Sequence, residues 1–155
     1  MNSMLTPDIA MVVETAIAPI FLLVAIGSLL NVMTSRLGRV VDRVRSLEDG
    51  LEAGETGEER ARHVDELKTL SRRINYSNRA ITLCTVAALL VSVLVAITFF
   101  GEITSLPVAA GIALLFVLAM GLLISGLAYF LAEIRVSTRQ LRVRHDLFDL
   151  PAGND

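Results

Sequence analysis

The chain has 155 residues, of which 54% are hydrophobic, and its mean hydropathy is +0.63. A soluble domain of this length cannot bury so many apolar side chains, so the composition excludes an ordinary soluble protein and favours an integral membrane protein. The net charge of -2 is small, but the 14 Lys and Arg residues are segregated into three windows, residues 36–45, 60–79 and 135–144.

The first predicted element is a membrane-spanning helix over about residues 12–33. Residues 15–35 contain no charged side chain, and about 20 apolar residues are enough to cross the hydrocarbon of a bilayer. The run is longer than the apolar part of a signal peptide and no basic residue precedes it, so we expect it to remain in the mature protein.

Two residues of this first span are candidates for a functional role. Glu14 is an acid near membrane depth, where a charge marks a pore or proton site unless it lies at the interface in contact with water. Pro19 has no amide proton and is expected to kink the helix close to Glu14. Both readings of Glu14 remain open.

The helix is expected to continue beyond the membrane over residues 34–49, because apolar residues keep a spacing of three and four: Leu37, Val40, Val41, Val44 and Leu47. After an acidic turn that contains glycine, a second helix is predicted over residues 57–79 on the same pattern: Ala61, Val64, Leu67, either Leu70 or Ser71, and Ile74. The two segments have similar lengths. They predict an antiparallel helical hairpin outside the membrane.

Two further spans are predicted at residues 80–100 and 108–132, neither of which contains a charged residue. The last one is expected to extend over residues 133–149, where Ile134, Leu141 and Phe148 lie seven residues apart. The predicted fold is all-α: a polytopic membrane protein with three transmembrane helices, extended into a cytoplasmic hairpin plus a C-terminal helix. We expect the three extensions to form one bundle.

The orientation follows from the charges at the ends of the spans. Basic residues lie at the ends of residues 12–33, 80–100 and 108–132 that face the predicted extensions, whereas the opposite ends carry only the acids Asp8 and Glu102. Since basic flanks stay in the cytoplasm, the N-terminus is expected outside and the C-terminus inside.

Three stretches resemble a known family: IAPIFLLVAIGSLLNVMTSRLGRVVDRVRSLE, SNRAITLCTVAALLV and LAEIRVSTRQLRV. Their order and spacing are similar to those of the bacterial membrane proteins grouped as domain of unknown function 2721, and the likeness covers residues 17–143. The resemblance implies a bacterial inner-membrane protein with three spans. It implies no activity and no catalytic or binding residue.

Small and polar side chains form faces on the spans. On the first two spans they include Ser28, Asn31, Asn78, Thr82, Thr85 and Ser92, and on the third Gly121 and Ser125. Such faces are typical of helix packing, and the alternative is a pore lining. Asn31 and Asn78 lie at similar depths and are expected to bridge the first two helices. The single cysteine, Cys84, is expected to be a small buried residue.

The arginines nearest the spans are candidates for contact with anionic lipid headgroups: Arg36, Arg39, Arg79, Arg135 and Arg139. A second expected role is pairing with acids in the extensions, namely Asp42, Asp65, Glu66 and Glu133. The two histidines are isolated, so no metal site is expected, and no cofactor motif or nucleic-acid recognition motif is found.

These features favour a non-enzymatic protein that forms a homo-oligomeric assembly or scaffold in the membrane, with a cytoplasmic helical bundle that organises partners or lipids. The alternative is an oligomeric ion channel or small-solute conduit lined by the polar face of the second span, with Glu14 at its outer mouth. A lipid-acting enzyme ranks last, because no polar groups converge at one depth.

Overall fold

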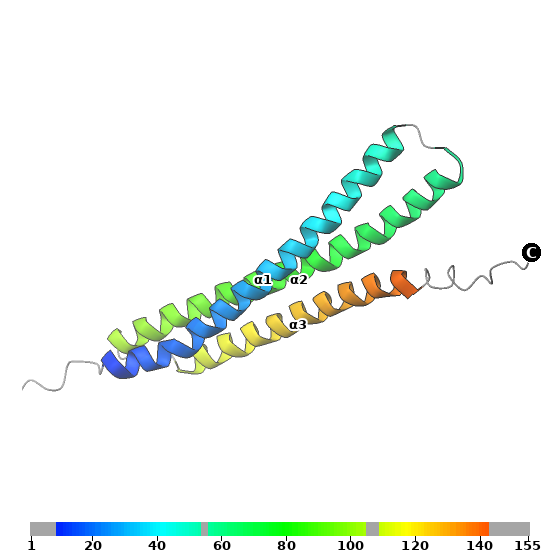
Figure 1. The fold of residues 1–155 in the computed structure, drawn as a ribbon. Helices are drawn as coiled ribbons and strands as arrows, with labels where there is room; N and C mark the ends of the chain where they lie inside the picture. Colours follow the sequence, from blue (N-terminus) through cyan, green and yellow to red (C-terminus); the bar gives the residue numbers. More distant parts are fainter. Residues whose placement is uncertain (1–8, 54–55, 105–108, 143–155) are drawn as a thin grey trace, which may run out of the picture.

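The computed structural model describes the backbone of residues 9–53, 56–104 and 109–142, and the side chains of residues 17–53, 56–101 and 109–137. The described chain forms three long helices, α1 (Ile9–Glu52), α2 (Glu58–Thr104) and α3 (Ala109–Arg142), which run antiparallel in succession (Figure 1). No strand occurs in the described residues, so the predicted all-α fold is confirmed.

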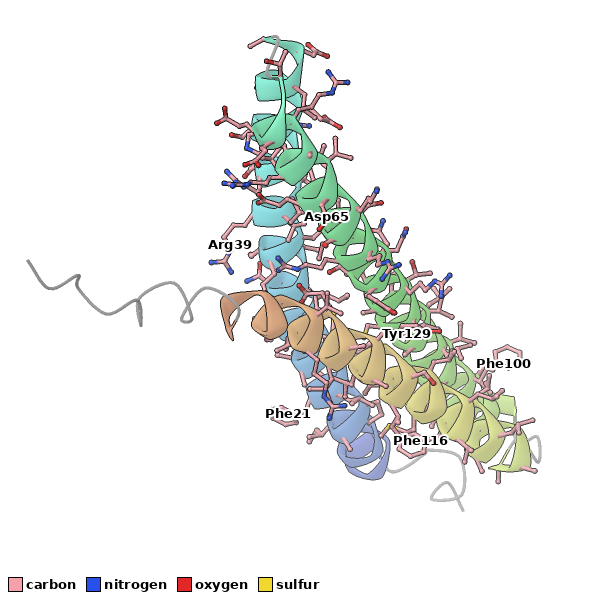
Figure 2. The ribbon with its side chains drawn as sticks, turned by 90° about the vertical axis from the view of Figure 1, so that its right-hand side faces the viewer. Phe21, Arg39, Asp65, Phe100, Phe116 and Tyr129 are labelled. Carbon is pink, nitrogen blue, oxygen red and sulfur yellow. The ribbon has the colours of Figure 1, made fainter. Side chains whose placement is uncertain are left out.

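Each helix contains a stretch long and apolar enough to cross a membrane, as expected for the three spans. The longest, α2, has 47 residues and is about 70 Å long, more than twice the roughly 30 Å of a bilayer's hydrocarbon. We call residues 17–35, 80–101 and 109–132 the apolar bundle. Residues 36–52 of α1 and 58–79 of α2 form the polar hairpin, in which charged side chains gather (Figure 2).

The helices pack through one seam with a seven-residue repeat. Its buried positions are Ile26, Met33, Val40 and Leu47 on α1, Leu70, Ser77, Cys84 and Val91 on α2, and Ala119, Gly126 and Glu133 on α3. A straight α-helix has 3.6 residues per turn, so a strict seven-residue repeat is typical of helices wound into a left-handed supercoil. The seam therefore continues from the apolar bundle into the polar hairpin.

Close packing in the apolar bundle depends on small residues of α2 and α3. A Cβ atom built on Gly126 would lie 2.7 Å from Cys84 Sγ and 3.2 Å from the carbonyl oxygen of Ala80, so only glycine fits here. The same test on Gly121 meets nothing within 4 Å. The small pair Gly121 and Ser125, expected to pack α3 against another helix, is exposed, so it packs against no other described helix of its own chain.

The polar hairpin has its own core, in which Val40, Leu47 and Leu70 are buried and Val44, Leu67 and Ile74 pack against them. Gly57 has φ of 74° directly before α2 begins, a conformation that favours glycine. Toward its C-terminal end α3 diverges from this hairpin (Figure 1). The expected single bundle of three extensions is therefore wrong for the part that the structure describes, and Leu141 and Phe148 lie outside the described side chains.

Candidate functional site

The most unusual polar group of the chain is the Glu133 carboxylate, which is 1% exposed. It occupies the last described position of the α3 seam, directly after the charge-free run that ends at Ala132. Arg73 of α2 donates two hydrogen bonds to its Oε1, from Nε at 3.1 Å and from Nη2 at 2.9 Å. Arg36 of α1 places Nη2 3.2 Å from its Oε2. One carboxylate thus joins all three helices.

The two oxygens of Glu133 are not equally satisfied. Oε1 accepts both hydrogen bonds from Arg73, whereas Oε2 lies at ion-pair distance from Arg36 without a hydrogen bond of acceptable geometry. Arg36 therefore makes a charge contact with Oε2 but not a well-aligned hydrogen bond. The Arg36 guanidinium also lies over the ring of Phe130, 5.4 Å from its centroid. Arg36 is therefore held between an α3 acid and an α3 ring.

Next to this junction, a pocket of about 320 Å³ lies between α1 and α2. Its lining combines four arginines, one acid and two seam residues: Arg36, Arg39, Val40, Arg43, Glu66, Leu70 and Arg73. Arg43 binds both oxygens of Glu66, with Nε 2.8 Å from Oε1 and Nη2 3.1 Å from Oε2. This hydrogen bond and the charge attraction of Glu66 raise the pKa of Arg43, so its positive charge is retained throughout the physiological range.

The acids expected to pair with arginines divide into two groups. Glu66 and Glu133 each form an ion pair with an arginine, as predicted. Asp42 and Asp65 are exposed and form no ion pair with another described residue, which corrects the prediction for both. Asp65 is labelled in Figure 2.

The predicted headgroup arginines occupy different environments. Arg36 is partly buried at the junction, Arg39 and Arg135 are exposed, and Arg79 is exposed with its guanidinium 5.9 Å from the centroid of the Tyr129 ring. The Arg139 side chain lies outside the described residues. Only Arg36 and Arg39 line the pocket; Arg43 and Arg73, which complete it, were missed because their distance from the apolar runs placed them in the hairpin rather than at the membrane.

The polar residues predicted to line a pore or pack helices are all exposed on this chain: Ser28, Asn31, Asn78, Thr82, Thr85 and Ser92. The serine and threonine hydroxyls among them donate to the carbonyl four residues earlier, for example Ser92 to Ala88 at 3.0 Å and Thr82 to Asn78 at 2.8 Å. No hydrogen bond joins the described side chains of Asn31 and Asn78, so their predicted bridge is wrong. The seam between α1 and α2 is occupied by Met33 and Ser77 instead.

The remaining candidates lie on α1. Pro19 is inside this helix, which continues past it. Glu14 belongs to the same helix, but its side chain lies outside those that the structure describes. The described residues contain no group of three or more His, Cys, Asp or Glu that could hold a metal ion.

Comparison with known proteins adds family membership to this geometry. The sequence profile of the family "Protein of unknown function (DUF2721)" matches residues 16–143. The chain belongs to this family. The match includes the seam, the Glu133 junction and the arginine pocket. Neither the curated proteins nor the solved structures contain a match. The description of the family names no activity.

Proposed function

We propose that this DUF2721 protein is a non-enzymatic membrane scaffold that assembles into a homo-oligomer, with the polar hairpin exposed to the cytoplasm as a platform for partners. The observation that carries the proposal is the α2 polar face, defined as Asn78, Thr82, Thr85 and Ser92, which its own chain leaves uncovered. It lies on α2 away from the seam positions Ala80, Cys84, Ala87 and Val91.

A face of this kind is unusual next to lipid. Elsewhere the exposed surface of the apolar bundle includes large apolar residues, for example Phe21 of α1 at 71% and Val117 of α3 at 66%, as suits contact with acyl chains. Small and hydroxyl side chains instead let a second helix approach closely and exchange hydrogen bonds. A second copy of α2 meets these requirements, because the same face is present on every copy.

Three matched serines test the assembly, one on each helix. Ser28, Ser92 and Ser125 are all exposed and all donate to the carbonyl four residues earlier, at 3.0, 3.0 and 2.8 Å. Each is replaced by leucine, and the mass of the purified protein is measured in detergent by light scattering. We expect Ser92→Leu to dissociate the oligomer while Ser28→Leu and Ser125→Leu leave it intact. A wild-type monomer, or equal behaviour of the three variants, contradicts the proposal.

The α2 polar face would also suit the alternative function, an oligomeric conduit for ions or small solutes. The same variants separate the two functions in liposomes. A conduit predicts ion flux through the wild-type protein and its loss in Ser92→Leu without any change in mass. A scaffold predicts ion-tight liposomes at full assembly.

The proposed location is a bacterial inner membrane with the N-terminus outside. The segregated basic residues support this orientation. In a Cys84→Ser background, single cysteines at Ser3 and Ser105 are expected to react with an impermeant thiol reagent added to intact cells, whereas one at Ala53, in the turn of the polar hairpin, is expected to react only after lysis. Labelling of Ala53 in intact cells reverses the orientation.

A further inference from the structure

The arginine pocket carries more positive charge than its described acidic partners neutralise. Its four arginines are opposed by Glu66 within the lining and by Glu133 behind it. Two positive charges are left over even when both acids are counted in full. Arg39 forms no ion pair with another described residue. The excess positive charges repel one another across this open pocket, and an anion from outside the chain would relieve the repulsion.

The guanidinium groups are held in place before any ligand arrives. Glu66 engages Nε and Nη2 of Arg43, and Glu133 engages the same two nitrogens of Arg73. Each arginine keeps further N–H groups, because a guanidinium has five donors. Fixed forks of this kind match the tetrahedral oxygens of a phosphate, and they lose little side-chain entropy on binding.

The pocket also lies at a specific depth. Arg36 follows Ser35, the last residue of the uncharged run of α1, and Arg43 is seven residues further, so these side chains originate within about 12 Å of the end of the apolar bundle. This is the layer of lipid headgroups and adjoining water. Val40 and Leu70 give the pocket an apolar wall, which would suit the carbon atoms next to a phosphodiester.

From charge, preorganisation and depth together, we infer that Arg36, Arg39, Arg43 and Arg73 form a binding site for the phosphoryl group of an anionic ligand. The chemistry is the same for the phosphodiester of an anionic lipid and for a phosphate from solution. Bound phosphate would bridge α1 and α2 beside the Glu133 junction and stabilise the polar hairpin. This inference does not depend on the proposed oligomer.

The test uses the full-length protein in an uncharged maltoside detergent. Cys84 has 0% exposure, so a thiol-reactive fluorescent dye reports thermal unfolding when this thiol becomes accessible. The protein is titrated with phosphatidylglycerol, with zwitterionic phosphatidylcholine or with inorganic phosphate, and sodium chloride at equal ionic strength is the reference. We expect phosphatidylglycerol to raise the unfolding midpoint of the wild-type protein and phosphatidylcholine to leave it unchanged.

Two arginines provide matched variants. Arg39→Gln removes a pocket arginine that supports no ion pair among the described residues, so folding is retained. Arg72→Gln removes an exposed charge from α2 beside the pocket without altering its lining. The half-saturating concentration is expected to rise roughly tenfold in Arg39→Gln, through loss of a charge-assisted hydrogen bond, and to stay within about twofold of wild type in Arg72→Gln. Arg39→Lys, which keeps the charge without the fork, is expected to lie between them.

The outcomes separate the sources of the phosphoryl group. A rise with phosphatidylglycerol alone identifies a lipid headgroup, and an equal rise with inorganic phosphate identifies a soluble ligand. Equal responses of Arg39→Gln and Arg72→Gln, or no response of the wild-type protein to either phosphoryl compound, overturn the inference.

Discussion

The apolar bundle and the polar hairpin share one seam but differ in what surrounds it. In the hairpin, large side chains such as Leu47 and Leu70 are buried and charged residues face outward. In the apolar bundle, Ile26 and Met33 of α1 pack against small residues of α2 such as Ala80 and Cys84, and Gly126 lets α3 approach α2 closely, while other large apolar residues face outward. Water drives large side chains into the hairpin core, whereas lipid supplies no such force and helices there associate through close contact. The same heptad geometry therefore depends on different interactions in its two halves.

The largest expected effect comes from placing a charge in the hairpin core. Leu47 is 2% exposed, so Leu47→Asp buries an unpaired carboxylate and is expected to destabilise the protein by about 4 kcal/mol. The neighbouring Ser46 is exposed, and Ser46→Asp is expected to change stability by less than about 0.5 kcal/mol. Thermal unfolding followed by circular dichroism measures both. Equal stability of the two variants would show that the hairpin has no core.

The next effect concerns the junction where the two regions meet. Glu133→Gln leaves Arg73 and Arg36, which are 15% and 28% exposed, without their acid. We expect a loss of about 3 kcal/mol, reduced from a fully buried pair because both arginines reach some solvent. Glu66→Gln is the control: Glu66 is 35% and Arg43 51% exposed, so less than about 1 kcal/mol is expected. Urea titration measures the free energy of unfolding of both variants. A loss of stability in Glu66→Gln as large as that in Glu133→Gln contradicts this ranking.

A smaller effect tests close packing in the apolar bundle. Gly126→Ala places a methyl group against Cys84 and the Ala80 carbonyl and is expected to destabilise by about 2 kcal/mol through overpacking. Gly121→Ala enters open space and is expected to be neutral or to stabilise by up to about 1 kcal/mol, because alanine favours the helix. The difference in unfolding midpoint between these two single-methyl variants measures the contact directly. If they behave alike, α2 and α3 do not approach at Gly126.

The sequence alone predicted the three helices and the burial of Cys84. A span needs a run of residues without charge, and basic residues mark where such a run ends. The sequence did not separate the two small-residue faces of α2: Ala80, Cys84 and Ala87 resemble Thr82, Thr85 and Ser92 in size, and the positions of α1 and α3 decide which face is covered. The α3 seam was assigned to Ile134, one residue from the true position Glu133, because an apolar pattern cannot anticipate a buried acid. Predicting the pocket required knowing that Arg43 of α1 and Arg73 of α2 line the same space between the two helices.

The seam is uninterrupted from Ile26 to Leu47, so α1 and α2 continue as one packed helix pair from the apolar bundle into the polar hairpin. Glu133 of α3 binds this helix pair near its middle, and the hairpin beyond Arg36 extends roughly 25 Å from that point. Because Glu133 of α3 pairs with Arg36 of α1 and Arg73 of α2 at the base of the hairpin, a displacement of the hairpin relative to α3 would have to break or rearrange these ion pairs.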